Sequence, residues 1–153
     1  MQIEDDKIFD CVIIGGGLAG LCLSIQLTQQ GNKVILFEKE TYPFHKVCGE
    51  YISLESWDFL IRLGLPLQNM DLPIIKNLVV TSPNGTMLKQ VLPLGGFGIS
   101  RYKIDNDLKN LAKQLGVFVM ENCKAEEIIF SKDIFRIQTT AGEFSSHVCC
   151  AGF

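Results

Sequence analysis

Three glycines and one acid have the spacing of a ligand site in this sequence. The glycines form the pattern G-x-G-x-x-G, and the acid, Glu38, follows about twenty residues later. In such a pattern Gly15 permits a tight turn, Gly17 lets a pyrophosphate approach the bare backbone, and Gly20 allows a helix to pack closely on a strand. Glu38 can accept hydrogen bonds from the hydroxyls of a ribose. These residue types in this order predict a dinucleotide site.

The segments around these residues are the ones that must position them. Residues 11–14 are an apolar run typical of a buried strand, and residues 34–37 form a second one. Between them, residues 18–30 carry a helical pattern. Its start, at Leu18 and Ala19, would offer backbone N–H groups and the positive end of the helix dipole to phosphates. The whole unit fits in roughly 30 residues, the size of one βαβ unit. A βαβ unit without a ligand is the alternative.

Length and composition limit the classes of protein to consider. The 153 residues are enough for one domain with a sizeable core, and 47% apolar with 20% charged residues is typical of a folded chain. The formal net charge of -3 argues against a nucleic-acid partner. No apolar run approaches the roughly 20 residues of a membrane-spanning helix. The acidic N-terminus also lacks the features of a signal peptide.

The cysteines favour a reducing compartment. The chain has six, and most stand inside apolar strand or helix patterns, where cysteine behaves as a small hydrophobic residue. They lack the paired spacing of a metal site, so we expect no metal. We therefore expect a cytoplasmic protein. The cysteines are Cys11, Cys22, Cys48, Cys123, Cys149 and Cys150.

The middle of the chain interrupts the βαβ alternation. Ser53 has the type and position of a helix N-cap, and Gly64 would end that helix. Two strands, at 75–82 and 86–92, are predicted around an Asn-Gly turn, a strong hairpin signal. We expect residues 66–98 to form a β-ribbon excursion that points toward a substrate domain.

The last third of the chain returns to the first layer. Asp105 is expected to cap a helix that Gly116 ends, and residues 117–120 read as a strand parallel to the first two. A β meander is predicted over 125–130 and 135–140, followed by a strand over 146–150. The chain then stops at Ala-Gly-Phe directly after a strand. We therefore expect a truncated domain that occupies residues 1–153.

Three further motifs resemble a known family. They are Lys-Val-Cys-Gly-Glu at 46–50, Ile-Ser-Arg-Tyr at 99–102 with Asp105, and Val-Cys-Cys-Ala-Gly at 148–152. With the glycine pattern, they look like the N-terminal part of FAD-dependent oxidoreductases and monooxygenases of the p-hydroxybenzoate-hydroxylase-like group. Within that group the sequence is most similar to the geranylgeranyl reductase branch. The resemblance runs over almost the whole chain.

The resemblance implies an α/β fold and FAD as the cofactor. The fold would be a Rossmann-like FAD-binding domain of the glutathione-reductase type. The glycines would meet the FAD pyrophosphate and Glu38 the adenosine ribose, while Arg101 would neutralise the phosphate-ribose region and Ala125 would lie against adenine. The full set of cofactor-binding residues that we expect is Gly15, Gly17, Leu18, Ala19, Gly20, Glu38, Lys39, Lys46, Cys48, Gly49, Arg101 and Ala125.

The implied function is that of a flavoprotein oxidoreductase or monooxygenase. Its substrate would be a lipid-like or aromatic small molecule, its electron donor NAD(P)H or another reductant, and a lipid-like substrate would bring peripheral contact with a membrane. Two alternatives stay open: a non-catalytic or incomplete cofactor-binding fragment, and an NAD-dependent dehydrogenase. The sequence assigns no catalytic residue. His45, Cys48 and Glu50 are weak candidates for acid–base or redox roles, and His147 is expected to be structural.

Overall fold

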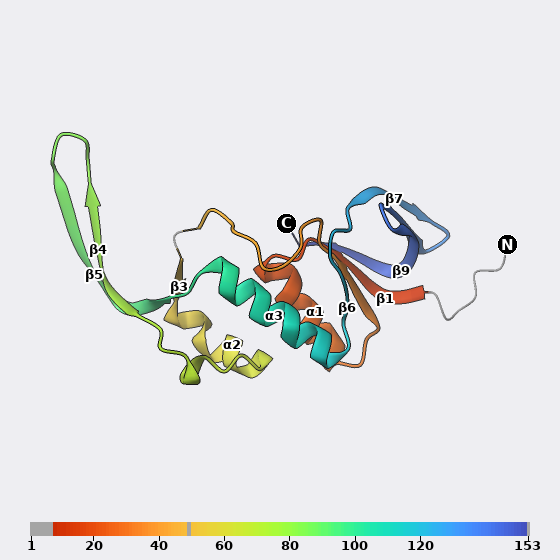
Figure 1. Cartoon of the computed structure of the whole chain (residues 1–153), viewed down its shortest axis with the longest axis horizontal. Coiled ribbons are helices and arrows are strands. Elements are labelled where there is room, and N and C mark those ends of the chain that lie inside the picture. The colour runs from red at the N-terminus through yellow and green to blue at the C-terminus, as the bar shows by residue number, and fades with distance from the viewer. Residues whose placement is uncertain (1–7, 49, 153) are drawn as a thin grey trace.

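The computed structural model describes residues 8–48 and 50–152 and contains two sheets with helices beside them (Figure 1). In the described part of the chain the larger sheet has the strand order β6-β2-β1-β9-β8-β7, and the smaller sheet has the order β3-β5-β4. The α-helices are α1 (Leu18–Gln29), α2 (Trp57–Leu63) and α3 (Arg101–Leu115). The strands are β1 (Ile8–Ile14), β2 (Val34–Phe37), β3 (Tyr51–Ser53), β4 (Ile74–Thr81), β5 (Met87–Gly98), β6 (Phe118–Met120), β7 (Ala125–Ser131), β8 (Ile134–Thr139) and β9 (Gly142–Ala151).

The larger sheet confirms the α/β Rossmann-like fold. Strands β6, β2, β1 and β9 are parallel neighbours, and α1 connects β1 to β2 as the crossover of the predicted βαβ unit. At its other edge, β9 pairs antiparallel with β8, and β8 with β7, which is the predicted meander. Strands β2 and β6 lie on one side of β1, and β9, β8 and β7 lie on the other, so the direction in which strands are added to the sheet changes between β1 and β9. Such a point is where doubly wound sheets bind ligands.

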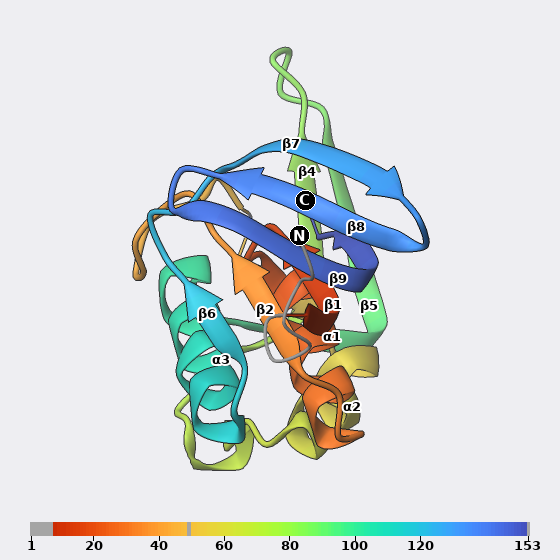
Figure 2. The same cartoon turned by 90° about the vertical axis from the view of Figure 1, so that its right-hand side faces the viewer.

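Alternate residues of the two central strands fill two separate cores. Ile13 and Leu36 point to the face that α1, α2 and α3 cover. Val12 and Phe37 point to the opposite face, where they pack with Ile137 of the meander. This follows from the period of two along a strand. Figure 2 shows the meander arching over β1 and β2 on the side away from the helices. Both faces of the parallel strands are therefore buried, as their continuous apolar runs predict.

Helix α3 begins earlier than the sequence analysis placed it. Ser100 is its N-cap, with a side chain that accepts a hydrogen bond from the Lys103 N–H, and Gly116 ends it in a left-handed conformation. The expectation that Asp105 caps this helix is wrong. Asp105 lies one turn inside, buried beside Ile104. In the described residues no helix is long and apolar enough to cross a membrane.

The predicted hairpin is present and longer than expected. Its strands β4 and β5 are joined through Gly85, and β5 runs on to Gly98 where the sequence suggested a break after Leu92. The short strand β3, which sequence reasoning missed, pairs with the end of β5. Beyond that point the ribbon projects alone from the molecule (Figure 1), and large apolar side chains such as Leu88 and Val91 are 61% and 62% exposed.

Two other boundaries differ from the predictions. Strand β9 begins at Gly142, four residues before the expected start, because it continues the meander before it joins β1. Ser53 does cap a helical turn, but this is a short 3-10 turn that precedes α2. The Trp57 side chain packs on the core beside Phe97, as expected for a residue of the apolar face of α2.

Leu108 should carry a large share of the stability of the helical layer. Its side chain is fully buried between α3 and the rest of the core. We expect Leu108→Ala to lower the free energy of unfolding by about 2–5 kcal/mol, because it leaves a cavity. Urea denaturation followed by circular dichroism measures this. Leu115→Ala is the matched control, since Leu115 ends the same helix but is 39% exposed; equal losses in the two variants would contradict the packing.

Candidate functional site

The glycine pattern lies where the carboxyl ends of β1 and β9 meet. Gly152 follows β9 and donates its N–H to the Ile14 carbonyl at 2.7 Å, while the Gly15 N–H reaches the Phe37 carbonyl of β2 at 2.9 Å. A Cβ on Gly20 would overlap the Gly15 carbonyl, and one on Gly152 would come within 2.9 Å of the Gly20 Cα. The turn, the helix and the end of β9 are thus packed together as closely as glycine allows.

Gly17 borders a different kind of space. It is the N-cap of α1, and no side chain of the described residues caps that helix end. A Cβ on Gly17 would lie 3.6 Å from the Gly152 carbonyl oxygen and 3.7 Å from both the Arg101 guanidinium and the Lys46 ammonium. The helix N-terminus therefore faces two cations across a gap with room for a small group. A pyrophosphate has the charge and hydrogen-bond acceptors that suit this arrangement.

Glu38 directly follows β2, and its carboxylate is already held by the backbone. Its Oε2 accepts from the Gly16 N–H at 2.9 Å and its Oε1 accepts from the Glu40 N–H at 3.0 Å. The residue is 5% exposed. Because each carboxylate oxygen has two lone pairs, both oxygens can accept one more hydrogen bond. The predicted contact with a ribose is chemically available.

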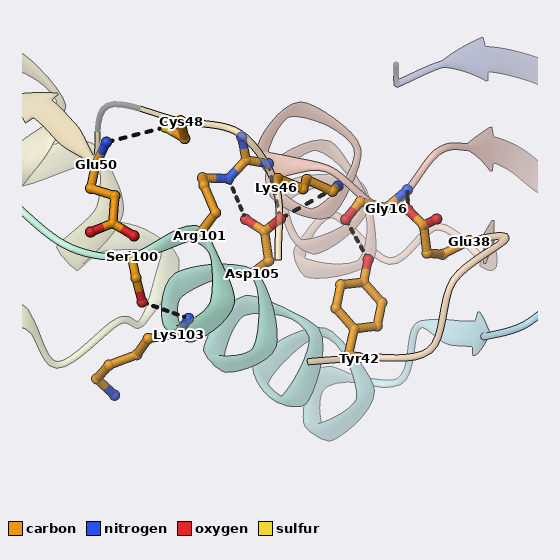
Figure 3. A network of polar contacts seen from close by, with 10 residues as sticks. All are labelled: Gly16, Glu38, Tyr42, Lys46, Cys48, Glu50, Ser100, Arg101, Lys103 and Asp105. Atoms are coloured by element: carbon orange, nitrogen blue, oxygen red, sulfur yellow. Dashed lines mark hydrogen bonds and ion pairs between the residues drawn. The ribbon is translucent and has the colours of Figure 1, made fainter. Parts of the chain in front are cut away.

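A buried carboxylate organises the two cations. Asp105 is 2% exposed and accepts hydrogen bonds from the Nε and Nη2 atoms of Arg101, each at 2.9 Å, while the Lys46 Nζ lies 3.5 Å away (Figure 3). The hydrogen bonds that Arg101 donates to Asp105 raise the pKa of its guanidinium. Two positive groups share one negative group, so the cluster keeps a net positive charge. That charge faces the gap beside Gly17.

A cavity of about 1050 Å³ joins these groups. The walls include most of the residues that the sequence analysis proposed for the cofactor: Gly15, Gly17, Leu18, Ala19, Glu38, Lys39, Lys46, Arg101 and Ala125. Gly20 lies behind the wall, in the contact between helix and strand. Cys48 is exposed, and its Sγ accepts a hydrogen bond from the Glu50 N–H at 3.4 Å; it is not among the wall residues. The prediction for Gly49 falls outside the described residues. The binding role of every residue in this set stays a prediction.

Sequence reasoning missed several residues of the site. The Tyr42 hydroxyl donates to the Gly16 carbonyl, and Gly152 completes the turn beside Gly15. Cys123 and Lys124 stand in the cavity wall next to Ala125. A glycine directly after the last strand was a usable signal for Gly152. For Tyr42 there was none, because its contact spans 26 residues of sequence.

The weak acid–base candidates are spread apart. The His45 ring lies in the cavity wall and stacks on Tyr102, with centroids 4.7 Å apart. Glu50 is exposed and has a left-handed backbone, with φ at 55°. His147 is exposed on β9.

Burial raises the pKa of the Cys11 thiol to about 12, and that of Cys22 to about 11. These two thiols are therefore protonated at neutral pH, as expected of packing residues.

Comparisons with known proteins agree with this geometry. A family model described as an FAD binding domain matches residues 10–46. Conditioned medium factor receptor 1 of Dictyostelium discoideum is 27% identical over 146 residues, which cover 86% of this chain and 29% of the relative. Menaquinone reductase of Mycobacterium tuberculosis is 23% identical over 129 residues, which cover 82% of this chain and 31% of the relative. The chain spans about a third of the length of these relatives.

A solved structure shares the fold over nearly the whole chain. The halogenase PltM, in a complex with phloroglucinol and FAD, superposes with a TM-score of 0.77 at 19% identity and covers 95% of this chain and 34% of its own. The matched family model gives FAD as the cofactor, and this neighbour shows the shared fold. Residues 10–46 thus match an FAD-binding domain, and the chain as a whole shares its fold with solved flavin-dependent halogenases.

The buried ion pair of α3 should matter far more than the exposed one beside it. We expect Asp105→Asn to lower the free energy of unfolding by about 2–4 kcal/mol, because it leaves Arg101 and Lys46 without their counter-charge. Asp107→Asn is the matched control. Asp107 also pairs four residues along the helix, with Lys103 at 2.8 Å, but that lysine side chain is 51% exposed. We expect its loss to cost less than about 0.5 kcal/mol. Urea denaturation compares the two, and equal costs would contradict the assigned role of Asp105.

Proposed function

We propose that this chain is the FAD-binding part of a flavoprotein oxidoreductase or monooxygenase. Its substrate is a lipid-like or aromatic small molecule, and its electrons come from NAD(P)H or another donor. The observation that carries the proposal is the single cavity in which a helix N-terminus, two cations and a ribose-competent carboxylate lie together. A dinucleotide cofactor presents phosphates and ribose hydroxyls at matching positions.

Each group of the cavity has a part in holding the cofactor. The backbone around Gly17 and the N–H groups that open α1 receive the pyrophosphate, and Arg101 with Lys46 neutralises it. Glu38 accepts hydrogen bonds from the adenosine ribose, and Ala125 lies against the adenine. Bound there, the flavin supplies the redox chemistry, while the protein supplies orientation and electrostatics.

The substrate class rests on the relatives and on the exposed ribbon. The name of one relative gives menaquinone, a lipid quinone, as its substrate, and the halogenase complex holds phloroglucinol, an aromatic compound. The apolar side chains of β4 and β5, exposed here on the projecting ribbon, fit the wall of a substrate domain that residues 66–98 enter. A lipid-like substrate would favour the geranylgeranyl reductase branch and peripheral contact with a membrane.

A reducing cytoplasm is the proposed compartment, since all six cysteines are free.

Gly17→Val should separate cofactor binding from folding. A Cβ at this position meets its neighbours at ordinary contact distances, and the backbone φ of -76° suits any residue. We expect the variant to fold, at a cost of about 1 kcal/mol or less for the poorer helix cap, and to lose measurable FAD affinity because its side chain occupies the phosphate gap. Flavin fluorescence titration measures the affinity and thermal unfolding the fold. An unchanged FAD affinity would remove the glycine loop from the site.

Reduction of the bound flavin tests the function itself. The chain is reconstituted with FAD, mixed anaerobically with NADH or NADPH, and followed by its visible flavin absorbance. We expect reduction faster than that of free FAD, because a protein that orients donor and flavin lowers the entropic barrier. The Gly17→Val variant with the same total FAD is the control. FAD that binds but is reduced no faster than free FAD would favour the alternative, a cofactor-binding module without catalysis.

A further inference from the structure

Both backbone polar groups of Gly16 are held by side chains. The N–H donates to Glu38 Oε2, and the carbonyl accepts from the Tyr42 hydroxyl (Figure 3). Gly16 lies between the glycine of the turn and the glycine that caps α1. The side chains of Glu38 and Tyr42, which both follow α1 in the chain, thus fix the orientation of the peptide groups next to the gap beside Gly17.

Tyr42 is firmly placed for this contact. Its ring is buried, with 6% of the residue exposed, and it packs beside Phe44 with centroids 5.4 Å apart. Burial, and secondarily the nearby carboxylate of Glu38, raise the pKa of the hydroxyl, which is therefore protonated and able to donate at any ordinary pH. A Cβ on Gly16 would overlap this hydroxyl. The Tyr42 hydroxyl thus excludes a larger residue than glycine at position 16, between the first two glycines of the pattern.

Tyr42 is in turn anchored to α3 through Glu121. The Tyr42 backbone N–H donates to Glu121 Oε2 at 3.0 Å, and the other oxygen of that carboxylate accepts from Lys113 at 2.8 Å. Lys109 lies 3.9 Å from the same oxygen, and its ammonium is 5.8 Å from the centre of the Tyr42 ring. Burial alone would raise the pKa of Glu121, but the hydrogen bonds and positive charges around it outweigh that effect and lower it. The carboxylate is therefore ionised at neutral pH and holds the Tyr42 backbone.

We propose that Tyr42 is a positioning residue that holds the glycine loop in its phosphate-binding conformation. The proposal rests on the proposed FAD site and adds a residue outside the glycine pattern to it. Without the hydroxyl, the buried Gly16 carbonyl loses its partner and the loop gains alternative conformations. Binding a pyrophosphate must then order the loop, which weakens affinity. The adenosine end, held by Glu38, does not depend on the Gly16 carbonyl.

Ligands with and without phosphate test this role in the 153-residue chain. We expect Tyr42→Phe to weaken binding of ADP and FAD roughly five- to twentyfold and to leave binding of adenosine unchanged within about twofold. Calorimetry measures FAD and ADP, and NMR shift titration measures the weaker adenosine. Tyr51→Phe is the matched control, because the Tyr51 hydroxyl also donates to a glycine carbonyl, that of Gly95 at 3.1 Å, in the smaller sheet. It should change none of the three affinities.

The outcomes separate this inference from the cofactor assignment. Unchanged ADP affinity in Tyr42→Phe overturns the role of Tyr42 while the FAD site stands. Equal weakening of ADP and adenosine, with a lower unfolding midpoint, also overturns it, since that pattern indicates general destabilisation. If the unaltered chain binds neither FAD nor ADP, the site itself is wrong and the role of Tyr42 falls with it.

A double-mutant cycle gives an independent readout. Gly16→Ala places a methyl group against the Tyr42 hydroxyl, so alone it should weaken ADP binding more than Tyr42→Phe does. Combined with Tyr42→Phe, part of that clash is removed, although the Glu38 Cβ at 3.0 Å keeps the position tight. We therefore expect the double variant to lose at least threefold less affinity than the product of the two single losses. Losses that multiply without coupling would contradict the contact.

Discussion

The site depends on one steric constraint, the close approach of β1, α1 and the end of β9. A Cβ on Gly20 would overlap the Gly15 carbonyl there, and one on Gly152 would lie 2.8 Å from the same oxygen. Because these three backbones come so close, the N-terminus of α1 lies directly over the carboxyl edge of the sheet. A ligand at that edge meets the helix dipole and the end of β2 together. The fold thus brings the helix N-terminus to the edge of the sheet that the Arg101 and Lys46 side chains also face.

The charged groups beside this contact compensate one another in part. Asp105 is buried, and an isolated buried carboxylate would be costly. It is offset by the forked hydrogen bonds from Arg101 and by Lys46, so the cluster is stable without a ligand and still keeps one positive charge in excess. An anion in the gap beside Gly17 then completes the balance. The same carboxylate that stabilises α3 also keeps the two cations beside Gly17.

The parts that sequence analysis predicted are local, and the parts that it missed are not. The βαβ unit, the Asn-Gly hairpin and the glycine ends of α2 and α3 each follow from neighbouring residues, and each is confirmed. The preference of aspartate for helix caps leads to the wrong prediction for Asp105, although Arg101 four residues earlier signals an ion pair along a helix. The start of β9 and the contact from Tyr42 to Gly16 depend on how distant segments pack. No local pattern carries that information.

Glu38 is the acid that follows the glycine pattern, and its carboxylate is hydrogen-bonded directly to the glycine loop. The carboxylate that is free to accept a ribose hydroxyl is the same one that accepts the Gly16 N–H. Glu38 and the glycine loop are therefore joined across the top of β1 and β2. Tyr42 closes that link from the other side by taking the Gly16 carbonyl. Because the loop is held by both, its geometry is fixed before a ligand arrives. A preorganised loop spends less binding free energy on ordering itself, and more of the contact energy appears as affinity.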